Sequence, residues 1–170
     1  MRQSLATGAG SRDISVTPLL GWSGPMNRTI LIADDKPQMR RILRSLLESH
    51  PGWDVTEAED GLQAVERAQQ CKPDVVVLDL AMPELNGFEA ARRIANTFPE
   101  VPIFLNTLYA SPQVEKEAEK LGVQRVISKT EEYQLVQAIE EVFGASGIEL
   151  TGSERPRQQR SHCTPRQHAA

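Results

Sequence analysis

The sequence predicts an α/β protein with a doubly wound, five-stranded parallel sheet and five helices. The main observation is that short apolar segments alternate five times with amphipathic segments between residues 28 and 149. A second is that residues 74–80 (DVVVLDL) are apolar except near their ends, as in a strand that helices cover on both faces. Five successive β–α units therefore predict a doubly wound sheet whose crossovers are right-handed.

The expected elements follow one another without a repeat. We expect strands at residues 28–33, 53–57, 74–80, 101–105 and 125–128. We expect a first helix that begins at residue 37 and is broken by Pro51-Gly52. Further helices are expected at residues 61–71, 87–98, 112–121 and 131–143. Apolar residues spaced three and four apart define the inner face of the first helix: Met39, Ile42, Leu43, Leu46 and Leu47. In the second helix the same spacing places Leu62, Val65 and Ala68 on one side.

Length and composition favour one domain with tails. The chain has 170 residues, of which 39% are hydrophobic, enough to bury a core. We expect residues 1–27 to be disordered or an extension, 28–148 to form the domain, and 149–170 to be a disordered basic tail. Two cysteines, Cys71 and Cys163, fit neither a disulfide-rich secreted scaffold nor a metal site. Without an apolar signal segment or membrane span, we expect a cytoplasmic protein with no membrane partner.

The net charge of −4 conceals an uneven distribution. Residues 28–149 carry 13 basic and 21 acidic side chains, whereas the flanks carry 6 basic and 2 acidic ones. An acidic domain does not suit the phosphate backbone of a nucleic acid. The basic tail lacks interleaved aromatic residues, so we interpret it as a solvated segment.

Polar residues stand at the carboxyl ends of the expected strands, where open α/β sheets bind ligands. Asp34 and Asp35 follow the first strand, and Asp79 lies at the end of the third. Asn106 and Thr107 follow the fourth strand, and Lys129 follows the fifth. Residues far apart in the sequence are therefore expected to meet at one edge of the sheet.

Three crowded carboxylates repel one another unless a cation or protons neutralise them. Oxygen ligands of this kind suit Mg²⁺, which retains several waters and also binds phosphate oxygens. A carboxylate beside a metal, an ammonium and a hydroxyl group fits nucleophilic attack on a phosphoryl group. Lys129 would offset negative charge on the phosphoryl oxygens, and Thr107 would donate a hydrogen bond to one of them.

Four stretches together resemble the receiver domain of two-component response regulators, the CheY-like superfamily. They are ILIADDKPQMRRIL, PDVVVLDLAMPELNGFEAARRI, VPIFLNT and VISKT, and they anchor about 120 residues. The resemblance implies a flavodoxin-like sheet with strand order 2-1-3-4-5. It also implies that Asp79 is the phospho-acceptor, Thr107 the switch hydroxyl and Lys129 the phosphate-pairing ammonium.

The resemblance further implies a Mg²⁺ site. Its protein ligands would be Asp34, Asp35, Asp79 and the backbone carbonyl of Ala81. Of the pair Asp34 and Asp35, Asp35 is the expected direct ligand. A histidine kinase or a phosphotransfer protein would supply the phosphoryl group. The face made by the fourth helix, fifth strand and fifth helix would then change its downstream protein partner. Such a domain catalyses only its own phosphotransfer and dephosphorylation, and nucleic-acid binding is not expected without an output domain.

Three positions depart from the family pattern, and one of them is Thr130, which follows Lys129 where Pro is common. Leu108 follows the switch threonine where a small residue is usual, so access to the site is expected to be narrower. Val126 occupies the fifth-strand position that usually carries Tyr or Phe, which leaves the aromatic part of the switch in question. Tyr109 is a candidate to compensate.

Two alternatives remain open from the sequence. One is a receiver fragment of a DNA-binding regulator, because 20 tail residues are too few for a helix-turn-helix output domain. The other is a Mg²⁺-dependent phosphatase of the haloacid-dehalogenase type, which also uses Asp, Thr or Ser, and Lys. Those enzymes place a DxD motif on the first strand, however, and this chain has Asp34-Asp35 there instead.

Overall fold

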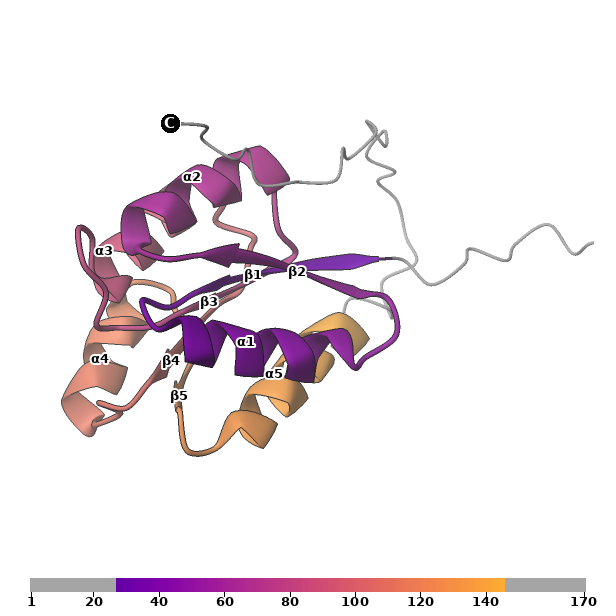
Figure 1. Cartoon of the computed structure of the whole chain (residues 1–170). Helices are drawn as coiled ribbons and strands as arrows, with labels where there is room; N and C mark the ends of the chain where they lie inside the picture. The colour runs from indigo at the N-terminus through magenta and orange to yellow at the C-terminus, as the bar shows by residue number, and fades with distance from the viewer. Residues whose placement is uncertain (1–26, 146–170) are drawn as a thin grey trace, which may run out of the picture.

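The computed structural model describes residues 27–145 (Figure 1). Of the expected flanking segments, residues 1–26 and 149–170 lie outside the described residues. The strands are β1 (Arg28–Ala33), β2 (Trp53–Ala58), β3 (Val75–Leu78), β4 (Ile103–Thr107) and β5 (Arg125–Ser128). The helices are α1 (Pro37–Glu48), α2 (Gly61–Cys71), α3 (Gly87–Thr97), α4 (Pro112–Lys120) and α5 (Glu132–Ala145).

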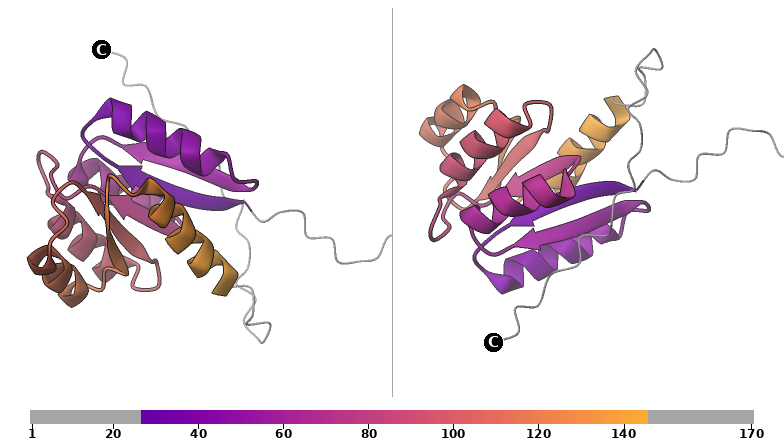
Figure 2. Two further views of the ribbon diagram at one scale, coloured as in Figure 1. Left: turned by 90° about the horizontal axis from the view of Figure 1, so that it is seen from below. Right: turned by 90° about the horizontal axis from the view of Figure 1, so that it is seen from above.

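The five strands form one parallel sheet in the order β2-β1-β3-β4-β5, which confirms the predicted topology. Helices α1 and α5 cover one face of the sheet, and α2, α3 and α4 cover the other (Figures 1 and 2). All four residues of β3 are buried, as the continuously apolar segment predicts for a strand with helices on both sides.

Each face of the sheet has its own apolar core. Alternate strand residues point to opposite faces, so Ile32, Val77, Phe104 and Ile127 pack with α1 and α5. Their sequence neighbours Leu31, Val76 and Leu105 belong to the core under α2, α3 and α4. Complete burial of one such side chain is worth about 1.5–3 kcal/mol, so these two layers hold the sheet between its helices.

Side-chain caps fix where three helices begin. Asp60 accepts a hydrogen bond from the backbone N–H of Gln63 at the start of α2. Asn86 caps α3 and Ser111 caps α4 in the same way. Proline occupies the first turn of α1 and of α4, where its missing N–H costs no helix hydrogen bond.

The structure moves the boundaries of three predicted strands. Strand β3 is shorter than the expected segment 74–80, β4 runs from Ile103 to Thr107 instead of over residues 101–105, and β2 ends one residue later than expected. The extension of β4 results from its pairing with β5, because Asn106 lies opposite Ile127 and Thr107 lies opposite Ser128. Asn106 and Thr107 are thus residues of the sheet and not of the loop that follows it.

The predicted inner faces of two helices are wrong in part. Ile42 of α1 is 47% exposed and Leu62 of α2 is 44% exposed. The predicted residues Leu43 and Leu47 are buried, Met39 and Leu46 are half-buried, and the unpredicted Arg40 is buried with them. Small residues, including Ala64 and Ala68, form the buried side of α2 and allow it to lie close to the sheet and α3.

Candidate functional site

The three predicted acidic residues meet at the carboxyl edge of the sheet. Ala33 of β1 pairs with Leu78 of β3, so Asp34 and Asp79 leave the sheet side by side. The backbone N–H of Asp79 donates to the carbonyl of Ala33 at 2.8 Å, which extends this pairing by one residue. One carboxylate oxygen from each of Asp34, Asp35 and Asp79 lies within 4.8 Å of the others.

Lys129 bridges two of these carboxylates. Its Nζ lies 2.5 Å from Oδ2 of Asp34 and 2.8 Å from Oδ2 of Asp79, and all three side chains are at least nine-tenths buried. Burial lowers the pKa of Lys129, but the hydrogen bonds and charges of Asp34 and Asp79 outweigh it and raise the pKa above its ordinary value. The side chain is therefore an ammonium at neutral pH and offsets part of the acidic charge.

Asp34 is held by contacts from α1 and the preceding turn. Its Oδ1 accepts a hydrogen bond of 2.8 Å from the backbone N–H of Lys36. Its backbone carbonyl accepts from Nη1 of Arg40, also at 2.8 Å. The same guanidinium forms ion pairs with Glu57 at 3.2 Å and Glu59 at 3.1 Å, so it joins α1, the end of β2 and the site.

The sequence interpretation missed Arg40 as a residue of the site. It is 93% buried, although charged side chains are rarely buried without partners. A signal was present, because Arg40 stands three residues before Leu43 and seven before Leu47, on the buried stripe of the helix.

We expect Arg40→Met to lower the free energy of unfolding by about 1–3 kcal/mol, because it removes charged hydrogen bonds at a buried position. Urea denaturation of the full chain measures the change. Arg41→Met is the matched control, since Arg41 is the exposed neighbour on the same helix. Equal stability of both variants and the wild type would show that Arg40 does not brace this edge.

Thr107 lies at the same edge but on the other face of the sheet. It is the last residue of β4 and is completely buried. Its Oγ1 accepts a hydrogen bond of 3.2 Å from the backbone N–H of Tyr109, and its own hydroxyl proton remains a donor. Its carbonyl accepts from the backbone N–H of Lys129 at 3.1 Å, which ties the two predicted site residues together.

The loop between β3 and α3 is closely packed around its glycine. Gly87 donates its N–H to the carbonyl of Leu80 at 3.0 Å. A Cβ at this position would lie 2.2 Å from the carbonyl oxygen of Asp79. Met82 and Leu85 anchor the loop in the core, whereas Ala81, two residues after Asp79, is exposed.

The departures from the expected pattern lie around the site. Leu108 is 57% exposed and Tyr109 is 64% exposed, so neither side chain is part of the buried core. Val126 is half-buried and packs on the core under α2, α3 and α4. The reduced access expected from Leu108 and the altered switching expected from Val126 stay predictions.

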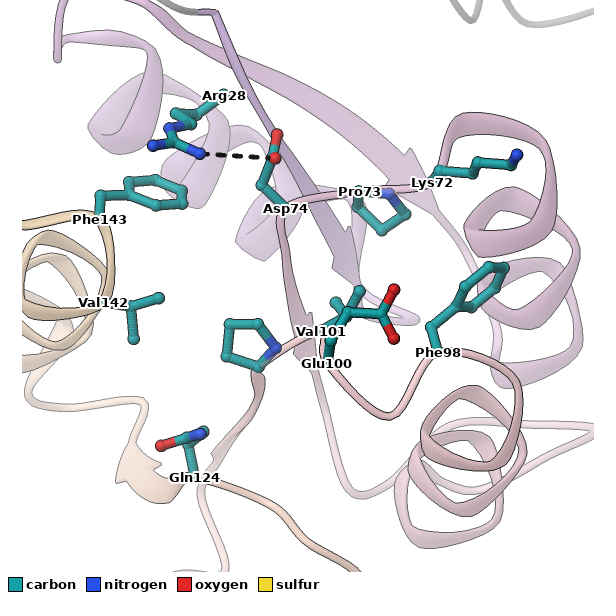
Figure 3. Close-up of a pocket in the computed structure, with 11 residues that line it drawn as sticks. Arg28, Lys72, Pro73, Asp74, Phe98, Glu100, Val101, Gln124, Val142 and Phe143 are labelled. Carbon is teal, nitrogen blue, oxygen red and sulfur yellow. Dashed lines mark ion pairs between the residues drawn. The ribbon is translucent and has the colours of Figure 1, made fainter. Parts of the chain in front are cut away.

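A cavity of about 510 Å³ lies at the opposite, amino-terminal edge of the sheet (Figure 3). Its lining includes Arg28 at the start of β1 and Asp74 just before β3, which form an ion pair of 3.7 Å. The guanidinium of Arg28 also lies 5.1 Å from the ring centre of Phe143 in α5. These contacts join the strand ends to α5, and the three-acid cluster lies at the other edge.

The donors at the carboxyl edge fit the predicted magnesium ion. Carboxylate oxygens from two neighbouring loops converge within reach of one small cation, and exposed Asp35 leaves one side open to water. Buried Asp34 and Asp79 already attract an ammonium, which shows that the site favours positive charge. Histidine and cysteine, which softer metals prefer, are absent from this cluster.

Comparisons with known proteins agree with this geometry. A family model described as the response regulator receiver domain matches residues 30–140. The chain belongs to the response regulator receiver family. The receiver is 33% identical over 119 residues to the chemotaxis protein CheY of Thermotoga maritima, and the match covers 69% of this chain and 98% of that protein. This assignment favours a receiver over the phosphatase alternative.

Solved structures show the same fold. The receiver resembles a two-component response regulator of the LuxR family from Aurantimonas sp. SI85-9A1, with a TM-score of 0.66 and 31% identity. That match covers 70% of this chain and 86% of the other. The response regulator domain of Thermotoga maritima CheB gives a TM-score of 0.62 and 29% identity, with 72% and 98% covered.

Other relatives are much longer than the region they share with this receiver. A protein-glutamate methylesterase/protein-glutamine glutaminase of Pyrococcus horikoshii is 41% identical over 80 residues. Those residues are 46% of this chain but only 22% of that protein. The match therefore concerns the receiver part alone.

Within residues 27–145, no helix has the length and apolar character needed to cross a membrane.

Proposed function

We propose that this receiver accepts a phosphoryl group on Asp79 from a histidine kinase or a phosphotransfer protein, and that phosphorylation changes its protein partner. The observation that carries the proposal is the Lys129 ammonium shared between buried Asp34 and Asp79, beside exposed Asp35. Perturbed charged groups gathered at a strand edge are typical of reactive sites. We also propose that the protein acts in the cytoplasm, where histidine kinases and phosphotransfer proteins phosphorylate receivers.

In the proposed reaction a carboxylate oxygen of Asp79 attacks the phosphorus atom of a phosphohistidine. An O–P bond forms, the N–P bond breaks, and the imidazole leaves with the electron pair. Asp34, Asp35, Asp79 and the carbonyl of Ala81 would hold Mg²⁺, which when bound offsets charge on the phosphoryl oxygens. Lys129 then donates to one phosphoryl oxygen and Thr107 donates its hydroxyl proton to another.

The proposed output surface consists of α4, β5 and α5. Thr107 and Lys129 connect it to the site, because they end β4 and follow β5. Two exposed tyrosines, Tyr109 after β4 and Tyr133 in α5, give this surface large side chains for contact with a partner protein. A change in the hydrogen bonds of Thr107 would therefore reach the partner surface through Tyr109, because Oγ1 of Thr107 accepts a hydrogen bond from the backbone N–H of Tyr109.

Phosphorylation of the full chain by acetyl phosphate tests the proposal. We expect intact mass spectrometry to show the addition of one phosphoryl group in the presence of Mg²⁺, because Asp79 displaces acetate from this small donor. Peptide mapping should place the label on Asp79. Removal of Mg²⁺ with EDTA should abolish the labelling, since the acidic cluster then repels the phosphate. A label on another residue, or equal labelling in EDTA, would contradict the proposal.

A further inference from the structure

Asn106 is a buried polar residue without a hydrogen-bond partner. Its side chain is 1% exposed, and neither Nδ2 nor Oδ1 has a partner. No other side-chain polar atom with this degree of burial lacks a partner within residues 27–145. An unpaired buried amide destabilises a folded protein, so such a group calls for an explanation.

The sheet places Asn106 in the same row as the acidic residues. Leu78 of β3 pairs with Leu105 of β4, so Asp79 and Asn106 are the next residues along their neighbouring strands. Asn106 also shares a face with Phe104, two residues earlier, and this face is the one under α1 and α5. Asp34 and Asp79 follow Ile32 and Val77 of that face by the same two residues.

Lys129 belongs to this face as well. It stands two residues after Ile127, which packs with α1 and α5 and lies opposite Asn106. Asn106 therefore lies on the strand between those that lead to Asp79 and to Lys129. Among the described strand residues, Asn106 and Thr107 are the buried polar ones, and of these two Asn106 is the one on this face.

The number of N–H donors on Lys129 indicates a role for the side-chain amide of Asn106. An ammonium has three N–H donors, and two of them are directed to Asp34 and Asp79. A carboxylate that binds a divalent cation is a weaker partner for a second positive group, because the two cations repel each other. One N–H of Lys129 then donates to a phosphoryl oxygen, and the amide oxygen of Asn106 is a neutral acceptor for another.

We propose that Asn106 is a positioning residue of the phosphorylation site, whose Oδ1 accepts a hydrogen bond from Nζ of Lys129 once a cation and a phosphoryl group occupy the carboxylates. The inference rests on the proposed function and adds a residue to it. The amide of Asn106 is then unpaired in the unphosphorylated receiver because its hydrogen bond forms only in the phosphorylated one.

Thermal unfolding of the full chain with and without Mg²⁺ and beryllofluoride, a phosphoryl mimic, tests the inference. We expect Asn106→Val to raise the unfolding temperature without ligand by roughly 3 °C, because the unpaired amide is gone. We expect it to weaken beryllofluoride affinity about tenfold, because a hydrogen bond to a charged group is lost. Affinity is read from the unfolding temperature as a function of beryllofluoride concentration.

Two further variants separate positioning from packing. Phe104→Leu, on the same face of β4, should lower the unfolding temperature and leave beryllofluoride affinity unchanged. In a Lys129→Met background, Asn106→Val should have no further effect on affinity, because its partner is absent. If Asn106→Val does not fold, Asn106→Ala provides the same comparison.

The outcomes distinguish this inference from the proposed function. Wild-type affinity in the Asn106 variant, or the same loss of affinity with and without Lys129, overturns the positioning role while the proposed function stands. If the wild-type receiver neither binds beryllofluoride nor takes a phosphoryl label, the proposed function fails and the inference fails with it.

Discussion

Asp79→Asn is expected to abolish the Mg²⁺-dependent phosphoryl label completely. A neutral amide is a poor nucleophile, so no stable O–P bond forms at this position. The variant should still fold, because Lys129 retains its 2.5 Å contact with Asp34 and the substitution removes one of three crowded negative charges. Intact mass spectrometry after incubation with acetyl phosphate measures the label, and circular dichroism verifies the fold.

The same chemical change at the opposite edge of the sheet provides the control. Asp74 accepts a hydrogen bond of 2.8 Å from the backbone N–H of Thr29 and pairs with Arg28, far from the acidic cluster. We expect Asp74→Asn to lower stability but to take up the full label. A full label on the Asp79 variant would move the phospho-acceptor to another residue, with Asp34 and Asp35 the first to examine.

The topology explains why the acidic cluster was predictable from the sequence. In a parallel sheet the carboxyl ends of all strands reach one edge, so residues that follow different strands meet without any local signal. Asp34, Asp79 and Lys129 come together for this reason, although Lys129 is 95 residues from Asp34. The continuously apolar β3 and the helical periodicities predicted the succession of strands and helices, whereas the resemblance to the receiver family supplied the order of strands in the sheet.

Burial of individual polar residues was not predictable in the same way. The end of β4 depends on pairing with β5, so the sequence of β4 alone does not show that Asn106 lies inside the sheet. Arg40 is buried because Glu57, Glu59 and the carbonyl of Asp34 surround it, and all three come from other elements. Ile42 shows the converse, since its helical spacing predicts burial but the residue is 47% exposed.

The loop that carries Asp79 depends on close backbone contacts at both ends. At one end, a Cβ on Gly87 would lie 2.2 Å from the carbonyl oxygen of Asp79 and 2.8 Å from Cα of Leu80. At the other end, a Cβ on Gly61 would lie 1.9 Å from the carbonyl oxygen of Leu85. These neighbours are backbone atoms, which cannot move aside as a flexible side chain could.

We therefore expect Gly87→Ala to lower the free energy of unfolding by about 3 kcal/mol, a value at the upper end for overpacking. The displaced backbone also carries Asp79, so phosphoryl labelling should fall sharply even at temperatures where the variant is folded. Urea denaturation measures the first effect and intact mass spectrometry the second. Both effects originate from one contact, so they should appear together.

Gly144→Ala is the matched control, because Gly144 is exposed in the last turn of α5 and a Cβ there meets nothing within 4 Å. Its unfolding free energy should change by less than about 1 kcal/mol, with any change toward stability, since alanine favours a helix more than glycine does. Labelling should be unaffected. A Gly87 variant as stable and as fully labelled as this control would show that the loop adapts, and that the position of Asp79 does not depend on this close approach.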